Sequence, residues 1–393
     1  MMHSILHLCT DGNFIDKSIS VFEHFYPGQN CFFLCRQKQL KKVTYAKSNL
    51  FVEFDPYSSD SYLDEVEKLD GEHKFDIIMV HGHKDAFVKI LKRINAQRQR
   101  KVYWIFWGYE MYFALGEDGK MPLVDNQCPW SIHTWMTPTR YSGMLKRLLR
   151  KPTFHDQLIE YLDVVDYFCF WLYEDFELLQ RFYPNTLKYK HFQYGGIYRA
   201  EPDTRINADF DKVEYEVRVD HSASITANHL TVMKKLKEID RDNVYKKIFP
   251  LAYGSDRNRK EIMRVGKKYF GEQFVAEIGY VPRDEYFRTL SKTGVALFGQ
   301  LRQEASGNIF PLIRAGAKVF MRKQNPLFSF CKRKGYIVFS LEDDLNTLED
   351  LRPLSREQML HNVNKSKENQ VYFEDFMPYL FEDIDSKKIK NIS

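Results

Sequence analysis

Polar and charged residues follow most apolar runs of this chain, at the positions where a parallel sheet carries its ligand contacts. Three of them could exchange a proton there: Asp11, His81 and Glu110. A carboxylate or an imidazole so placed can remove the proton of a bound hydroxyl group as a new bond forms. Each also has a plainer interpretation: Asp11 as a turn or cap residue, Glu110 as a carboxylate that satisfies backbone donors, and His81 as a buried imidazole.

The second half contains a loop suited to a phosphate group. The apolar run 294–298 is followed by a polar loop, 303–308, and by a helix-like run that stops at Gly316. Pro311 fits only the first turn of that helix, so we expect Asn308 to be its N-cap. Unpaired N–H groups and the positive end of the helix dipole would then meet a diphosphate. An ordinary strand-to-helix turn would explain the same residues.

Further polar residues of the second half could complete this site. We expect Arg283 to supply a cation, with Arg302 and Arg257 in reserve, although arginines in exposed loops are commonly solvated. Hydroxyl groups after two other strands would contact phosphate, ribose or base. The predicted binding residues are Ser222, Ser224, Tyr253, Arg283, Gln303, Glu304, Ser306, Gly307 and Asn308.

Two parallel sheets are needed to position these residues. Strand-like and helix-like runs alternate on both sides of a polar segment, 195–213, that is typical of a linker. Such alternation predicts parallel sheets covered by helices on both faces. We therefore expect an α/β protein of two Rossmann-like domains, 1–205 and 206–369, whose strands face each other across a cleft. A C-terminal helix at about 370–393 could pack back on the first domain.

Composition limits the class of protein. The chain has 393 residues, of which 44% are hydrophobic and 28% charged, as in a soluble globular protein of two or three domains. It has no run of about 18 apolar residues to span a bilayer, and its N-terminus lacks the features of a signal peptide. Its six cysteines show no CxxC pairing, which favours free thiols in a reducing cytoplasm.

One segment concentrates basic charge beyond the mild net charge of +5. Residues 140–154 contain five basic residues and no acid, with Met144 and three leucines at helical spacing on the other side. Such a helix can lie on an anionic membrane surface, or it can be a solvated helix that packs its leucines on the core. The predicted membrane contacts are Lys146, Arg147, Arg150 and Lys151. We expect no nucleic-acid binding, because interleaved aromatic residues and zinc-ligand spacing are missing.

Short motifs run through both halves of the chain. They are His81-Gly82, Trp107-Gly108-x-Glu110-x-Tyr112, Ser222, Pro250-x-x-Tyr253, Arg302-Gln303, Gly307, Ala315-Gly316, Asn325-Pro326 and Asp343-Asp344-Leu345. In this order and at this spacing they resemble glycosyltransferase family 56, over about residues 5–345. Known members of that family are the TDP-N-acetylfucosamine:lipid II N-acetylfucosaminyltransferases of enterobacterial common antigen synthesis. The similarity is thin between residues 114 and 165.

The resemblance implies a GT-B fold and an inverting, metal-independent transfer without a cofactor. The donor would be an amino-deoxy or deoxy hexose linked to TDP, UDP or GDP. The acceptor would be a polyprenyl-diphosphate-linked saccharide of surface polysaccharide synthesis, at the inner face of the bacterial cell membrane. Three positions depart from the family: Glu110 replaces an aspartate, Asp220-His221-Ser222 replaces Gly-Asn-Ser, and 304–307 replaces Gln-Gly-Ile-Gly.

Inversion at a sugar carbon needs a base, a stabilised leaving group and reactants held in line. We assign the base to Glu110, with Asp11 as its nearest rival and His81 third. Glu110 follows a buried strand and two bulky aromatic residues, so desolvation should raise its pKa toward a useful value. Asp-x-Asp sequences at 209–211, 240–242 and 383–385 do not follow an apolar strand, so we expect no metal ion. A non-catalytic nucleotide-sugar-binding scaffold is the alternative.

Overall fold

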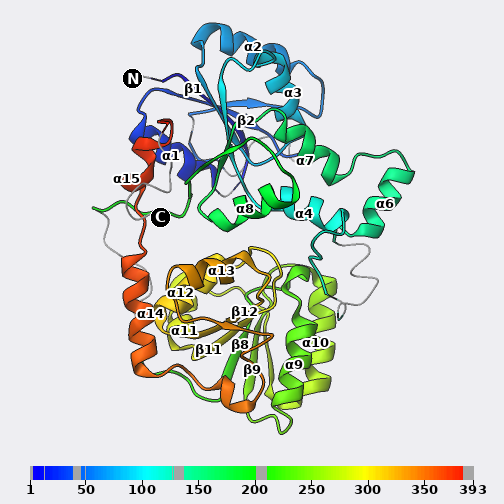
Figure 1. Ribbon diagram of the computed structural model, residues 1–393, viewed down its shortest axis with the longest axis vertical. Coiled ribbons are helices and arrows are strands. Elements are labelled where there is room, and N and C mark those ends of the chain that lie inside the picture. Colours follow the sequence, from blue (N-terminus) through cyan, green and yellow to red (C-terminus); the bar gives the residue numbers. More distant parts are fainter. Residues whose placement is uncertain are drawn as a thin grey trace. The chain divides into compact units, whose positions relative to one another are not determined.

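The computed structural model describes residues 3–12, 14–38, 46–48, 50–125, 127, 137–200 and 210–383 (Figure 1). Contacts between residues divide the chain into two compact units. The first comprises Met1–Ala114, Lys151–Glu201 and Val371–Ser393, and the second comprises Leu115–Arg150 and Pro202–Gln370. The segment Leu115–Arg150, which the sequence analysis assigned to the first domain, therefore groups with the second unit.

The first unit is built on a parallel sheet with the strand order β3-β2-β1-β4-β5-β6-β7. Its strands are β1 (Ile5–Thr10), β2 (Asn30–Cys35), β3 (Val52–Phe54), β4 (Ile77–His81), β5 (Lys101–Ile105), β6 (Tyr167–Cys169) and β7 (Lys188–Lys190). Its helices are α1 (Ile15–Phe25), α2 (Tyr62–His73), α3 (Asp85–Ile94), α7 (Phe154–Leu162), α8 (Tyr173–Phe182) and the start of α4 (Tyr109–Glu117). The central strands are apolar almost throughout because helices bury both faces of the sheet.

The second unit is built on another parallel sheet, with the order β10-β9-β8-β11-β12-β13. Its strands are β8 (Glu216–Val219), β9 (Lys246–Pro250), β10 (Phe274–Glu277), β11 (Val295–Phe298), β12 (Lys318–Met321) and β13 (Phe339–Ser340). Its helices are α6 (Arg140–Leu148), α9 (His229–Ile239), α10 (Asp256–Phe270), α11 (Arg283–Lys292), α12 (Ser306–Ala315), α13 (Pro326–Arg333) and α14 (Arg356–Glu368). Helices α9 and α10 cover one face, while α11, α12 and α13 lie on the other (Figure 1).

Both sheets reverse their direction of growth beside their first strand. In the first unit the chain builds outward from β1 through β2 to β3 and then returns to β4 on the other side of β1. In the second unit it builds outward from β8 to β10 and returns to β11. Loops diverge at such a reversal, and in open α/β sheets ligands bind at the carboxyl ends of the two strands beside it. The predicted α/β class with two Rossmann-like parallel sheets is confirmed.

The C-terminal segment belongs to the core of the first unit. The short helix α15 (Phe373–Phe376) buries Phe373, Phe376 and Met377 in the same apolar cluster as Ile5 and Phe22. A backbone hydrogen bond from Phe373 N–H to the carbonyl of Ile197 joins this segment to the end of the first-unit segment Lys151–Glu201. In place of the predicted helix over about 370–393, the described residues form only α15 and a 3-10 turn at Met377–Tyr379, and residues beyond 383 lie outside the described part.

Candidate functional site

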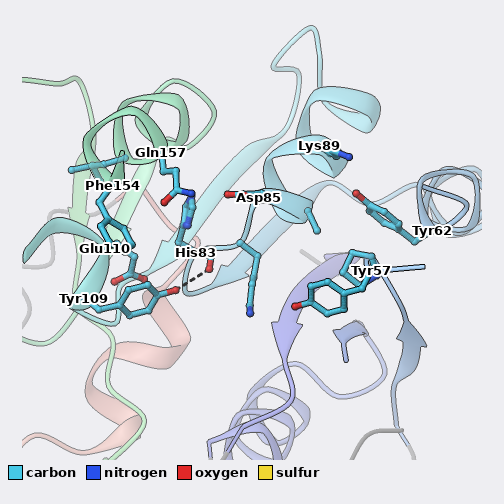
Figure 2. A pocket seen from close by; sticks show the side chains of 13 residues that line it. Tyr57, Tyr62, His83, Asp85, Lys89, Tyr109, Glu110, Phe154 and Gln157 are labelled. Atoms are coloured by element: carbon cyan, nitrogen blue, oxygen red, sulfur yellow. Dashed lines mark hydrogen bonds between the residues drawn. The ribbon is translucent and has the colours of Figure 1, made fainter. Parts of the chain in front are cut away.

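A pocket of about 460 Å³ lies within the first unit (Figure 2). This volume is within the range of small-molecule sites. Glu110, Tyr109 and Phe154 stand at one end of the pocket, and Tyr62 and Lys89 at the other (Figure 2). The lining residues are Pro56, Tyr57, Tyr62, His83, Lys84, Asp85, Ala86, Lys89, Tyr109, Glu110, Phe154, Gln157 and Leu158.

Glu110 is the only one of the three candidate bases among the residues that line this pocket. It is the second residue of α4 and is 4% exposed. In the described part of the chain neither of its carboxylate oxygens has a hydrogen-bond partner. Burial raises the pKa of Glu110 to about 8, and the backbone groups of Trp107, Gly108 and Glu110 offset only part of this. Near neutral pH the side chain is therefore mostly a neutral carboxylic acid.

The loops around Glu110 are locked to each other by close packing. Gly82 has a φ of 79°, and a Cβ atom there would stand 3.1 Å from the Trp107 ring, so any larger residue at this position would be strained. The Tyr109 hydroxyl donates a hydrogen bond to the carbonyl of His83 at 2.8 Å (Figure 2). Tyr161 from α7 donates to the carbonyl of Gly82 at 2.9 Å. Of the predicted Trp-Gly-x-Glu motif, Tyr109 and Glu110 line the pocket, while Trp107 packs against Gly82.

His81 belongs to a buried chain of hydrogen bonds that uses both of its ring nitrogens. Asn30 donates its amide N–H groups to Glu23 and to the carbonyl of Tyr26, so its Oδ1 must accept from Nε2–H of His7, at 3.0 Å. His7 Nδ1 then accepts from His81 Nε2–H at 3.1 Å, and His81 Nδ1 accepts from the Tyr194 hydroxyl at 2.7 Å. Burial lowers the pKa of His7 to about 3 and that of His81 well below its usual range.

Asp11 is buried and lies directly after β1. Its carboxylate accepts the backbone N–H of Ala46 at 3.2 Å, and its carbonyl accepts from the Gln37 side chain at 2.6 Å. These bonds hold the segment that follows β2. Both imidazole nitrogens of His81 are thus engaged and the Asp11 carboxylate is bonded to the backbone, whereas Glu110 lines the pocket.

In the second unit the loops after β8 and β11 are joined by a short chain of hydrogen bonds. The Thr226 hydroxyl donates to the Glu304 carboxylate at 2.5 Å, so the Ser224 hydroxyl must donate to Thr226, at 2.8 Å. Arg302 forms an ion pair with Glu304 at 3.1 Å. Ser222 accepts the backbone N–H of Ser224 at 3.2 Å. Most of the predicted binding residues, Gln303 included, therefore lie at the β8–β11 reversal.

The start of α12 differs from the prediction. The helix begins at Ser306, and its N-cap is Ala305 in the left-handed conformation, not Asn308. The carbonyl of Ala305 accepts the backbone N–H groups of Asn308 and Ile309 at 2.8 and 2.9 Å, so the backbone N–H of Asn308 is not available to a ligand. The N–H groups of Ser306 and Gly307 have no hydrogen-bond partner in the described residues. Among the same residues, no neighbouring atom lies within 4 Å of where a Cβ of Gly307 would stand.

Two residues that the prediction omitted lie directly after β8. Asp220 is buried, and its Oδ1 accepts both the backbone N–H and the Nδ1–H of His221 at 2.6 Å. Tyr253, one of the predicted residues, is 57% exposed and stands edge-on to the His221 ring at 5.7 Å. Arg283 begins α11, and its side chain lies outside the described part. The sequence signal for the Asp220–His221 pair was its departure from the family motif.

Helix α6 presents its apolar side to solvent. Met144, Leu145 and Leu148 are 63%, 54% and 79% exposed. The opposite side is attached to the protein: Lys146 pairs with Glu117, and Arg147 pairs with Asp118 at 2.9 Å. The alternative in which the leucines pack on the core is therefore wrong, and two of the predicted membrane contacts are engaged with acids of their own unit.

Neither a bilayer-spanning helix nor a metal-binding cluster occurs among the residues that the structure describes. None of their helices combines the length and the apolar character that crossing a bilayer requires. They also contain no group of three or more His, Cys, Asp and Glu side chains that could hold a metal ion. Asp240, in one of the Asp-x-Asp sequences, is fully buried in an ion pair with Lys247 at 2.5 Å.

Comparison with known proteins places the fold. No family model matches the chain, and no curated protein matches it in sequence. The N-terminal domain of trehalose-6-phosphate phosphatase from Candida albicans is similar in structure, with a TM-score of 0.57, 11% identity, and coverage of 93% of this chain and 92% of that one. A UDP-forming α,α-trehalose-phosphate synthase from Burkholderia xenovorans has a TM-score of 0.55, 10% identity and coverage of 99% of both chains.

Sucrose-phosphate synthase from Thermosynechococcus elongatus is a further match, with a TM-score of 0.52, 10% identity, and coverage of 94% of this chain and 96% of that one. At such low identities the similarity concerns the fold alone. The resemblance to glycosyltransferase family 56 therefore stays a prediction. Together with the two parallel sheets, the matches establish that the chain has the GT-B fold.

Proposed function

We propose that the protein is an inverting glycosyltransferase that takes a hexose from a nucleotide diphosphate sugar. The observation that carries the proposal is the start of α12, where Ser306 and Gly307 offer N–H groups beside open space at the β8–β11 reversal. A helix N-terminus in this position suits a diphosphate, because its N–H groups and its dipole both favour negative charge. The fold matches include a UDP-forming trehalose-phosphate synthase.

In the proposed reaction Glu110 acts as the base. An acceptor hydroxyl oxygen attacks the anomeric carbon of the donor, and the bond from that carbon to the diphosphate oxygen breaks with its electron pair on the diphosphate. The hydroxyl proton passes to the Glu110 carboxylate. Because burial raises the pKa of Glu110 to about 8, the carboxylate is a strong acceptor once formed but is the minor form near neutral pH.

We further propose that no divalent ion takes part in the transfer. The support is that the N–H groups at the start of α12 and the Arg302 guanidinium group lie where negative charge would develop on the leaving diphosphate. Turnover in excess chelator should match turnover with added magnesium. Complete loss of activity in chelator, restored by the metal, would refute this.

The acceptor in this proposal is a polyprenyl-diphosphate-linked saccharide, reached from an anionic membrane surface. The support is α6, whose exposed apolar stripe is flanked by the exposed cations Arg140, Arg150 and Lys151. Apolar side chains that enter the headgroup region beside cations are the features of an interfacial helix. The protein would then lie on the inner face of the cell membrane.

The proposal is tested by supplying donors and acceptor separately. Thermal unfolding is measured with a panel of UDP-, TDP- and GDP-linked sugars, since a ligand of the folded state raises its apparent stability. The stabilising donor is then incubated with polyprenyl-diphosphate-linked saccharides, and the release of nucleoside diphosphate is followed. Stabilisation without transfer or donor hydrolysis would indicate a binding scaffold, and no response to any nucleotide would sink the proposal.

A further inference from the structure

His221 is a candidate anion-binding residue that lies directly beside the predicted donor-binding loop. It follows β8 and immediately precedes Ser222, and its side chain is 9% exposed. Its Nδ1 lies 2.6 Å from Oδ1 of Asp220. The Asp220 carboxylate accepts hydrogen bonds only, so Nδ1 must carry a proton. The other ring nitrogen, Nε2, has no hydrogen-bond partner in the described part of the chain and is free to meet a ligand.

Burial and hydrogen bonds hold Asp220 in place beside the imidazole. Its side chain is fully buried and its φ is 61°, in the left-handed region. Oδ1 also accepts the backbone N–H of His221 at 2.6 Å, and Oδ2 accepts from the amide of Gln300. With both oxygens occupied, Asp220 positions His221 and holds a negative charge against it.

The charged groups around His221 determine its protonation. Burial lowers the pKa of His221, but the charge and hydrogen bond of Asp220 and the charge of Glu304 outweigh burial and the opposing charge of Arg302, so the pKa is raised overall. His229, at the start of α9, is buried, and burial lowers its pKa, so its charged form is disfavoured. The exposed ring of Tyr253 stands edge-on to the imidazole. A bound anion would favour the imidazolium further.

We propose that Nε2–H of the His221 imidazolium binds the diphosphate of the donor, with Asp220 as its positioning residue. This inference rests on the proposed function. As the bond between the sugar carbon and the diphosphate oxygen breaks, the electron pair remains on that oxygen, and the imidazolium stabilises the added charge without giving up its proton. Donor affinity should therefore weaken as pH rises and His221 loses its charge. The Ser306 and Gly307 N–H groups at the same reversal do not titrate, so they cannot cause such a change.

Titration calorimetry with UDP, TDP and GDP between pH 5.5 and 8.5 tests this assignment. His221→Gln is compared with wild type at each pH, because the ratio of their dissociation constants cancels the ionisation of the nucleotide itself. His361→Gln, an exposed histidine of the same unit, is the matched control. We expect the dissociation constant of His221→Gln to exceed that of wild type by about tenfold or more at pH 5.5. The ratio should fall toward a small constant at pH 8.5, because wild type makes the charge-assisted hydrogen bond only at low pH, where His221 is protonated. The control should give a ratio near one throughout.

Asp220→Asn separates the role of charge from that of shape. Asparagine tolerates the left-handed conformation and can accept the same two bonds from His221. Gln300 Oε1, which has no partner among the described residues, can turn toward the new amide. We expect this variant to move the pH dependence of nucleotide affinity to lower pH. Suppose that wild type binds a nucleotide but the ratio of the His221→Gln and wild-type dissociation constants stays near one or does not vary with pH. This result would overturn the role of His221 and leave the proposed function intact. No binding of any of the three nucleotides by wild type would overturn both.

Discussion

Glu110 in the first unit and His221 in the second are both buried titratable groups just after a strand. The surroundings of Glu110 favour its neutral form, whereas those of His221 favour its charged form. Glu110 has no side-chain partner among the described residues, and the nearby backbone N–H groups offset only part of the effect of burial, so the neutral acid is favoured. His221 has a fixed carboxylate at 2.6 Å, so its charged form is favoured despite burial. A partner of opposite charge thus decides which form a buried group takes. In the proposed reaction the first group must gain a proton and the second must keep one, and each environment suits its task.

The largest effect should follow from removing the Glu110 carboxylate. Glu110→Gln should lower the rate of transfer by about 10²- to 10⁴-fold, the usual contribution of a positioned base. Nucleotide affinity should be unchanged, because the donor residues lie in the other unit. Steady-state kinetics and calorimetry on the same preparation check both statements. Glu110→Asp, which retains a carboxylate, is the control and should keep more activity than the glutamine variant; wild-type turnover by Glu110→Gln would remove this residue from the base role.

The same substitution should change stability in a pH-dependent way. The folded protein keeps the Glu110 proton up to pH of about 8, whereas the unfolded chain loses it near the usual value of 4.5. Folding therefore binds a proton between these values, and wild-type stability falls as pH rises through this window. Glu110→Gln lacks this proton, so its stability relative to wild type should increase from pH 5 to pH 8, by up to roughly 4 kcal/mol.

Denaturant unfolding at several pH values measures this difference. Glu177→Gln, at an exposed position of α8, is the matched control and should follow wild type within about 0.5 kcal/mol. A difference between Glu110→Gln and wild type that does not change with pH would mean that Glu110 is ionised in the folded protein. The contrast with His221 would then be lost.

A third test sets the two groups against each other in the pH dependence of kcat/KM. Ionisation of Glu110 should raise kcat/KM by about tenfold per pH unit below pH 8, and loss of the His221 proton should lower it as pH rises. Together they predict a bell-shaped profile. Glu110→Gln should abolish the rising limb and His221→Gln the falling limb. A profile that keeps its shape in both variants would show that neither group titrates in the reaction.

Much of the architecture could be predicted from the sequence, because strand and helix signals are local. The run 294–298 became β11, and the alternation on both sides of the linker became two parallel sheets. The start of α12 was misplaced because Ala305 adopts a left-handed conformation that alanine rarely shows. Neighbouring loops are bonded to each other just before it, as the Thr226–Glu304 hydrogen bond shows, and no local pattern reveals such a bond.

The environments of the candidate groups were harder to predict than their positions. The buried strand before Glu110 correctly indicated a raised pKa, since desolvation follows from burial alone. The hydrogen-bond chain of His81 was not visible, because it joins residues far apart in the sequence, His7 and Tyr194 among them. The Asp220–His221 pair is adjacent in the sequence, but it depends on the conformation of Asp220. Pairwise contacts of this kind depend on tertiary structure.

The smallest predicted effect concerns α6, where sequence and structure agree on the helix but only the structure shows which side is exposed. Leu145→Ser and Leu148→Ser should each weaken binding to vesicles that contain anionic lipid by about tenfold, because each removes an apolar side chain from the headgroup region. Thermal stability should not change, since both leucines are more than half exposed. Leu360→Ser, at a 49% exposed position of α14, is the control and should bind as wild type does. Vesicle flotation measures the affinities. If wild type binds neutral vesicles as well as anionic ones, the flanking cations have no role. If the affinity of both variants is unchanged, this helix is not the membrane contact.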